Sequence, residues 1–149
     1  MRKAFSMITA IIVIVLMATV AVFILNLSGK MVKGTTAQFQ REQSMLLAKS
    51  YTEYAIMAVT ANEQNTTNCL NNITGAYPVS NPIYNIDVNI SYIANNTTDI
   101  SNCAKKLSTT ATTEKSPLNI IVDVFVSYTD LDHPDDQNIT YHRRSLQKI

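Results

Sequence analysis

Acidic side chains cluster near the C-terminal end of the chain, where their type and spacing suit the binding of a cation. Four aspartates lie within seven residues around Pro134, at Asp130, Asp132, Asp135 and Asp136. Carboxylate oxygens in loops of this kind are ligands for hard cations such as calcium. The spacing lacks the glycine and the terminal glutamate of an EF-hand, so that motif is excluded. The alternative is an acidic turn whose carboxylates are only solvated.

Asparagines followed two positions later by serine or threonine form a second candidate group, for N-glycosylation. The pattern occurs at Asn65, Asn72, Asn89, Asn95, Asn96 and Asn138. An acidic residue also stands two positions before Asn65, Asn89 and Asn138, as some bacterial N-glycosylation systems require. These three are therefore the predicted acceptors. The alternative is chance, because Asn and Thr are abundant and Asn89 lies in a segment that alternates like the polar face of a strand.

The two cysteines, Cys69 and Cys103, fit neither a CxxC redox motif nor a cysteine and histidine zinc site. The simplest interpretation is a disulfide formed in an oxidising compartment. Closing a loop of this length in the unfolded chain stabilises the folded state by roughly 3–4 kcal/mol. The alternative is a pair of free, buried thiols.

Sequence motifs of enzymes are missing from the chain. There is no HExxH, no GxSxG and no phosphate-binding glycine loop, and the chain has only three glycines and two histidines. We therefore expect no enzyme, no catalytic residue and no organic cofactor. The formal net charge of +1, without a long basic run, also argues against a nucleic-acid partner.

The N-terminal region is apolar enough to span a membrane. No charge occurs from Ala4 to Gly29, and 19 of the 23 residues from Phe5 to Leu27 are hydrophobic. As a helix these residues extend about 34 Å, against about 30 Å for a hydrocarbon core. A cleaved secretory signal has an apolar stretch of only about 7–15 residues, so we expect a retained anchor. Arg2 and Lys3 favour a cytoplasmic N-terminus.

Beyond this anchor, the periodicity predicts a helix that continues into a β-rich head. Apolar residues at spacings of three, four and seven predict a core-facing stripe formed by Phe39, Leu46, Leu47, Tyr51, Tyr54, Ala55 and Ala58. Alternation then predicts strands over 86–92 and 120–128 and a shorter one over 139–143, with a Ser/Thr-rich loop over 108–117. The order predicts an α+β fold in which a long N-terminal helix packs on a small antiparallel sheet.

The first residues resemble the class III leader of type IV pilins and type II secretion pseudopilins. Met1-Arg2-Lys3-Ala4 is a short basic leader, and Phe5 opens the long apolar run. In that family a prepilin peptidase cuts before the phenylalanine, whose new amino group is methylated. The resemblance implies cleavage between Ala4 and Phe5. It also implies a leader at 1–4, a transmembrane segment at 5–29, an amphipathic helix at 30–62 and an extracytoplasmic head at 63–149.

Two positions depart from the family pattern. Ala4 stands where glycine usually precedes the cut, and Thr9 stands where the fifth residue of the mature chain is normally glutamate. In these filaments that glutamate is thought to pair with the amino terminus of a neighbouring subunit. A threonine hydroxyl cannot neutralise an ammonium group. The resemblance therefore implies a minor subunit, with Thr9 at the assembly position.

The partners implied by the resemblance are the prepilin peptidase, other pilin or pseudopilin subunits and the bacterial inner membrane. Some pseudopilins hold calcium in a C-terminal loop, which makes calcium at the aspartate cluster the one inorganic ligand to consider. The alternative left open is a single-pass, membrane-anchored binding or scaffold protein whose head lies outside the cytoplasm and which is neither processed nor polymerised.

Overall fold

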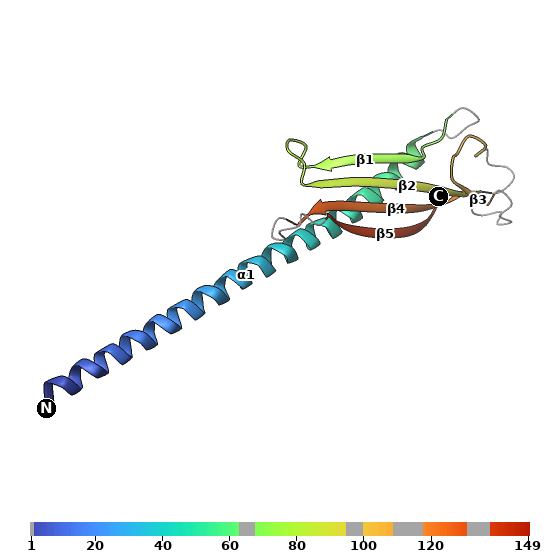
Figure 1. The fold of residues 1–149 in the computed structure, drawn as a ribbon. Coiled ribbons are helices and arrows are strands. Elements are labelled where there is room, and N and C mark those ends of the chain that lie inside the picture. The colour runs from blue at the N-terminus through green and yellow to red at the C-terminus, as the bar shows by residue number, and fades with distance from the viewer. Residues whose placement is uncertain (1, 63–67, 95–99, 109–117, 131–137) are drawn as a thin grey trace. The chain divides into compact units, whose positions relative to one another are not determined.

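The computed structural model describes residues 2–62, 68–94, 100–108, 118–130 and 138–149, with side chains from Met7 onward. Its elements are α1 (Arg2–Ala61), β1 (Asn72–Tyr77), β2 (Tyr84–Ala94), β3 (Lys106–Ser108), β4 (Leu118–Thr129) and β5 (Asn138–Lys148) (Figure 1). Two compact units divide the chain, Met1–Phe39 and Gln40–Ile149. The fold is α+β, as the sequence predicts.

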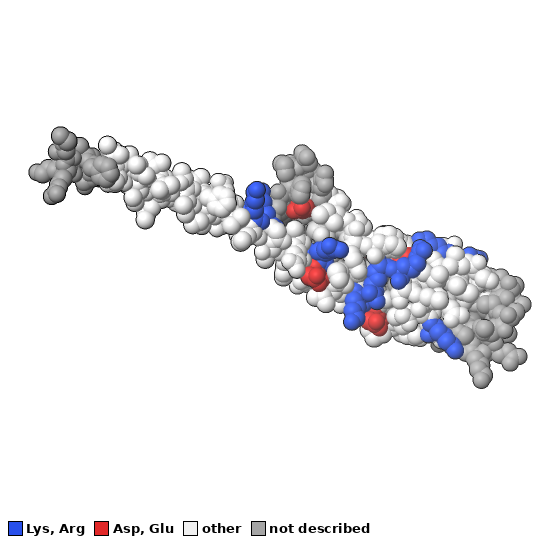
Figure 2. Space-filling view, turned by 90° about the horizontal axis from the view of Figure 1, so that it is seen from below, with Lys and Arg blue, Asp and Glu red and all other residues white. Residues whose placement is uncertain are grey.

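The first unit is the N-terminal part of α1. Every described side chain from Met7 to Phe39 is exposed. The most apolar 18-residue window has a mean hydropathy of 3.1, and none of it is buried. Figure 2 shows the beginning of this unit as a run of uncharged side chains, up to the first Lys or Arg side chains in blue. By length and composition, α1 is therefore able to cross a membrane.

The second unit is built on a sheet with the strand order β1-β2-β4-β5, in which all neighbouring strands are antiparallel. β3 is a short parallel addition to β2. The register pairs Val88 with Val124 and Ile90 with Val122, so the apolar residues of β2 and β4 share one face. Their burial alternates as expected for a sheet that is covered on one side.

The C-terminal part of α1 covers that apolar face through small side chains. The fully or nearly buried positions of the helix are Gln40, Ser44, Ala48, Thr52, Ala55 and Val59. Ser44 Oγ donates to the Arg41 carbonyl at 2.7 Å, and Thr52 Oγ1 donates to the Ala48 carbonyl at 2.7 Å. These hydroxyls are satisfied within the helix, so they can face the core without a partner on the sheet. Between Gln40 and Val59 at its two ends, the buried face of the helix therefore consists of small residues.

The predicted core stripe of the helix is therefore wrong in part. Ala55 is buried, and Leu47, Tyr51 and Ala58 are half-buried. Phe39, Leu46 and Tyr54, in contrast, are 65%, 61% and 52% exposed. The physical reason is the phase of the helix, because Leu46 and Tyr54 lie on the side opposite the buried positions Ser44, Ala48 and Thr52, and Phe39 lies before the second unit begins.

The strands also differ from their expected bounds. β2 and β4 are where the alternation places them, but each is longer at its ends. β5 has 11 residues rather than a short stretch, because it pairs with β4 along its whole length. β1 was not predicted, since its sequence NITGAY carries few large apolar residues, and β3 was not predicted either.

Candidate functional sites on the helix and the head

The predicted processing and assembly positions all lie in α1. Ala4 and Phe5 belong to the first turns of the helix, and Thr9 follows one turn later with an exposed side chain. Whether the chain is cut between Ala4 and Phe5 depends on a peptidase and stays a prediction.

Polar side chains within and just after the apolar segment donate hydrogen bonds to backbone carbonyls of their own helix. Thr19 Oγ1 donates to the Leu16 carbonyl at 2.8 Å, and Asn26 Nδ2 donates to the Val22 carbonyl at 3.1 Å. Thr35 and Thr36 donate in the same way to carbonyls four residues earlier, at 2.9 Å and 3.1 Å. In hydrocarbon no water is present to accept these bonds, so internal pairing makes the segment compatible with lipid.

Large apolar side chains also lie on the exposed side of α1 after the membrane-length segment. Phe39, Leu46, Tyr54 and Met57 are each more than half exposed. Their spacing of seven, eight and three residues places them along one face of a helix, opposite the buried stripe. Glu42, Ser50 and Glu53 are exposed on the same face, so the apolar side chains are separated by polar ones. A face of mixed apolar and polar side chains is typical of a contact between proteins.

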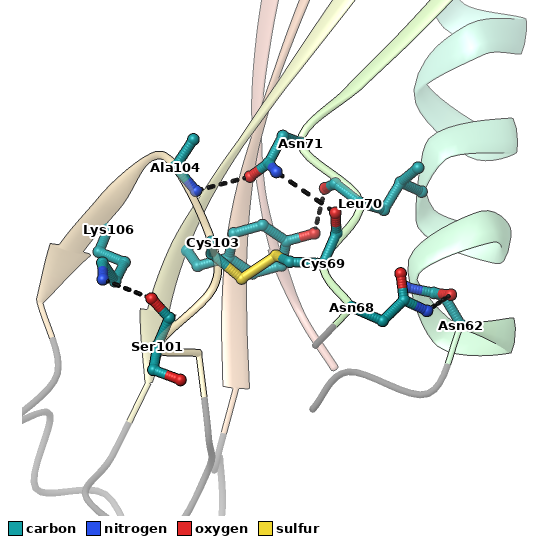
Figure 3. The surroundings of a disulfide bond; sticks show 10 residues. Asn62, Asn68, Cys69, Leu70, Asn71, Ser101, Cys103, Ala104 and Lys106 are labelled. Carbon is teal, nitrogen blue, oxygen red and sulfur yellow. Dashed lines mark hydrogen bonds between the residues drawn. A yellow bond between two sulfur atoms is a disulfide. The ribbon is translucent and has the colours of Figure 1, made fainter. Parts of the chain in front are cut away.

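The structure pairs Cys69 with Cys103, as the sequence predicts, with their Cα atoms 5.2 Å apart (Figure 3). Cys103 is buried and Cys69 is half-buried. The bond joins the segment that follows α1 to the segment that precedes β3. A disulfide is typical of an extracytoplasmic domain, because cytosolic thiols are kept reduced.

Hydrogen bonds around the disulfide join these segments to each other, to β2 and to the end of α1. Asn71 Oδ1 accepts the Ala104 backbone N–H at 2.8 Å, and Asn71 Nδ2 donates to the Cys69 carbonyl at 3.3 Å (Figure 3). The Tyr92 hydroxyl from β2 donates to the Leu70 carbonyl. Asn68 Nδ2 donates to Asn62 Oδ1 at 2.9 Å, which ties the chain to the end of α1. The disulfide is thus one part of a wider network of bonds at this end of the sheet.

The three predicted glycosylation sites have different surroundings. Asn138 is exposed at the first residue of β5. Asn89 is half-buried in the middle of β2, and its Oδ1 accepts a hydrogen bond from Lys105 Nζ at 2.6 Å. Asn65 lies outside the described residues. Of these two described candidates, Asn138 therefore has the more accessible side-chain amide.

The predicted calcium cluster lies mostly outside the described residues, which include Asp130 but not Asp132, Asp135 or Asp136. Asp130 is 5% exposed, so it is not a freely solvated carboxylate. Burial, followed by the nearby Asp130 carboxylate, raises the pKa of the Tyr128 hydroxyl, while Arg41 opposes the rise. Within the described part of the chain, no three histidine, cysteine, aspartate or glutamate side chains are grouped as metal ligands.

A cluster that the sequence did not indicate lies on the face of the sheet away from α1. Asp123 is 7% exposed and accepts hydrogen bonds from Arg144 Nε and Nη2 at 2.7 Å and 2.9 Å. His142 Nε2 lies 2.8 Å from the same carboxylate, and its ring stacks on Phe125 with 4.3 Å between centroids. The hydrogen bonds from Arg144 are the main cause that lowers the pKa of Asp123, and those from His142 add to it against the effect of burial.

The geometry of this cluster favours structure rather than catalysis. Arg144 and Asp123 face each other in the β4–β5 register, and their bidentate pairing fixes the two strands. The only signal in the sequence was the two-residue spacing of His142 and Arg144, which places both on one face of a strand. Their partner became identifiable only with the register.

Comparison of the chain with protein-family models, with curated proteins and with solved structures finds no match. The architecture is therefore described from the geometry of this chain alone. A long N-terminal helix, apolar and exposed in its first part and packed on an antiparallel sheet in its second, is a pilin-like arrangement.

Proposed function

We propose that this protein is a minor subunit of a type IV pilus-like filament or type II secretion pseudopilus in a bacterial inner membrane. The observation that carries the proposal is the distribution of exposed apolar side chains along α1. An anchor needs only about 20 apolar residues. Here large exposed apolar side chains recur past the membrane-length segment, at Phe39, Leu46 and Met57.

A filament of parallel helices gives both parts of this surface a partner. Before assembly, the segment from Phe5 to Leu27 is buried in lipid and the head lies on the extracytoplasmic side, consistent with its disulfide. On assembly, the apolar helices of neighbouring subunits replace the lipid, and the outward stripe of the stem contacts the same neighbours. The driving force is burial of apolar area, at about 25 cal/mol per Å².

The main competing function is a membrane-anchored binding or scaffold protein that is never processed. Its N-terminus separates the two directly. We expect the mature chain isolated from membranes to begin at Phe5 with a methylated amino group, as measured by intact-protein and N-terminal peptide mass spectrometry. An Ala4→Val variant, with a bulkier residue before the cut, is expected to remain unprocessed but still membrane-bound. A native chain that retains Met1 would refute the filament proposal.

Thr9 supplies a second test, of assembly itself. We expect Thr9→Glu to increase incorporation into filaments, because a carboxylate is able to pair with the ammonium group of a neighbouring subunit. Thr19→Glu is the matched control, since it places the same charge in the same apolar helix ten residues later without that partner. The measurement is the amount of subunit in sheared filament fractions. Equal incorporation of both variants would show that position 9 has no special role.

A further inference from the structure

Strand β5 forms one edge of the sheet of the second unit. In the strand order β1-β2-β4-β5 it has a single neighbour among the described strands, β4, and its 11 residues lie along that neighbour for their whole length. Figure 1 shows β5 at the margin of the sheet. The other end of the strand order is β1, which has six residues. A long open edge presents a row of backbone donors and acceptors to which a further strand is able to pair.

The register shows which backbone groups of β5 point to this open edge. Ile149 N–H donates to the Leu118 carbonyl at 3.0 Å, in line with the register that pairs Lys148 with Asn119. Residues opposite each other in an antiparallel pair alternate between those that exchange hydrogen bonds and those that do not. The odd-numbered residues of β5 therefore bond to β4. The even-numbered ones, from Asn138 to Lys148, direct their N–H and C=O groups toward the open edge.

The side chains of the same even-numbered residues share one face of the sheet, because successive side chains of a strand point to opposite faces. Near the end of β5 this face presents Arg144, Leu146 and Lys148, whose side chains are exposed. Arg144 bonds to Asp123 through Nε and Nη2, so its Nη1 group is not engaged by that carboxylate. The open edge therefore displays a cation, an apolar side chain and a second cation at every second residue.

The strand itself contains no acidic residue that would offset these charges. From Asn138 to Ile149 the sequence has two arginines and one lysine, and neither aspartate nor glutamate. In Figure 2, which is seen from below the view of Figure 1, several Lys and Arg side chains lie close together on the head. The β1 edge differs, since the segment Asn72–Tyr77 carries no charge.

Arg143 provides a second, independent observation. It lies opposite Val124 in the register, so its side chain is on the face of β5 that is turned toward the core. That side chain is half-buried, and its Nε is buried and has no hydrogen-bond acceptor among the described residues. A donor that leaves water without an acceptor costs free energy. A strand added at the open edge places acceptor groups directly beside Arg143.

A second copy of this strand is a poor partner for the open edge. If two β5 strands paired symmetrically along their full length, Arg143 would lie opposite Arg143, and Arg144 would lie opposite His142. Like charges at opposed positions are destabilising, and basic residues are one of the means by which natural edges avoid pairing with themselves. A strand that carries carboxylates is favoured instead, since it gives each of these cations a counter-charge.

We propose that the open edge of β5 binds an extended, acidic segment of a partner protein as an additional antiparallel strand. The pairing rules give this segment a sequence pattern. Acidic residues lie opposite Lys148 and Arg144, and an apolar residue midway between them lies opposite Leu146. The residue after the second acidic one lies beside Arg143 and supplies an oxygen acceptor. The contact involves only the second unit, and it does not depend on the filament proposal.

A labelled peptide tests the pattern directly. The probe is the short peptide TETVTEDT, in which the glutamates, the valine and the aspartate take the positions given above. Its binding to the full-length protein in zwitterionic detergent is followed by fluorescence anisotropy, with detergent alone as the baseline. The peptide EETDTVTT has the same composition in a different order, so it measures attraction by charge alone. We expect TETVTEDT to bind at least about fivefold more tightly than EETDTVTT.

Methylation of single backbone nitrogens of the peptide separates strand pairing from attraction by charge. N-methylation of the valine removes a backbone donor that faces β5 and places a methyl group in the contact. N-methylation of the threonine that follows the valine is the matched control, because that nitrogen faces away from β5. We expect the first change to weaken binding at least about tenfold and the second to weaken it less than about twofold.

Charge reversal on the protein gives the corresponding test of the edge. Lys148→Glu should weaken binding of TETVTEDT about fivefold, because an attraction at the edge becomes a repulsion. Lys106→Glu makes the same change of net charge in β3, which pairs with β2 and is separated from β5 by β2 and β4. It should change binding less than about twofold. The peptide comparisons use the wild-type protein, so they test the proposal even where a variant does not fold.

Several outcomes would refute the proposal. One is the absence of binding up to about 1 mM peptide. Equal binding of the two peptide orders would show that charge alone is sufficient, and equal loss from the two N-methylated peptides would show that the peptide is not a paired strand. A bound fraction that falls as the protein concentration rises would place a second copy at the edge in place of the acidic partner.

Discussion

Reduction of the Cys69–Cys103 disulfide is expected to lower the melting temperature of the head substantially. The bond closes a loop with a sequence separation of 34. In the chain-entropy model this constraint on the unfolded state is worth about 3.8 kcal/mol at 25 °C. The Gln40–Ile149 unit, at about 2.1 cal/mol/K per residue, has an unfolding entropy of roughly 230 cal/mol/K. The ratio of the two values gives a decrease of about 16 °C.

The assay is thermal unfolding of the full chain in detergent, followed by near-ultraviolet circular dichroism of tyrosine. All seven tyrosines lie between Tyr51 and Tyr141, so this signal reports on the head and not on the apolar segment. The wild-type protein is measured with and without a phosphine reductant, and the Cys69→Ala/Cys103→Ala variant is measured without it. Unfolding must be reversible for the comparison to be valid.

We expect the double variant to melt close to the reduced wild type, because Ala replaces the buried Cys103 side chain without introducing a polar group. A reduced protein that melts within about 3 °C of the oxidised one would refute the loop-entropy reasoning, since the bond would then constrain little. A double variant far less stable than the reduced protein would show instead that packing of Cys103, which is 3% exposed, is the larger effect.

Three further outcomes are expected. Gly75→Ala should destabilise the head by about 1–3 kcal/mol in denaturant titration, because the new methyl group overlaps the Tyr51 ring, and Tyr51→Leu in the same chain should recover much of that loss. If the two changes are additive, the contact is not the cause. Asp123→Asn should lower the free energy of unfolding by about 1 kcal/mol at neutral pH. This is less than a fully buried ion pair would contribute, because the Arg144 side chain is 67% exposed. The pKa of Asp123 in the folded protein is lowered from 3.8, so the stability that the charged carboxylate contributes is present above that pH and is lost as the pH falls below it. The melting temperatures of wild type and variant should therefore converge in acid. A difference in melting temperature that stays constant with pH would exclude the charge as its source. If the native protein is glycosylated, peptide mass spectrometry should find the glycan on exposed Asn138 and not on half-buried Asn89, and a modified Asn89 would contradict the assignment.

The sequence predicts those parts of the fold whose pattern is local. β2 and β4 follow from strict alternation, and the membrane-length segment follows from composition. The sheet-facing stripe of α1 could not be predicted in the same way, because Ser44 and Thr52 read as polar and face the core only through bonds to their own helix.

The candidate sites also divide into those that a local sequence pattern predicts and those that depend on tertiary structure. The disulfide follows from counting cysteines in a small domain. The pairing of Asp123 with Arg144 depends on strand register across more than twenty residues of sequence, which no local pattern contains.

The burial of the second half of α1 against the sheet also has a mechanical consequence. If the protein is pulled by its N-terminal helix, as the proposed function requires, the second unit receives the load at its first residue, Gln40. The 22 residues from there to Ala61 form about 33 Å of helix, and buried positions recur along it from Gln40 to Val59. Load on this contact is therefore shared over several turns of the helix rather than carried at one end. Farther along the chain, the Cys69–Cys103 bond limits how far the 34-residue separation between the two cysteines is able to extend under load.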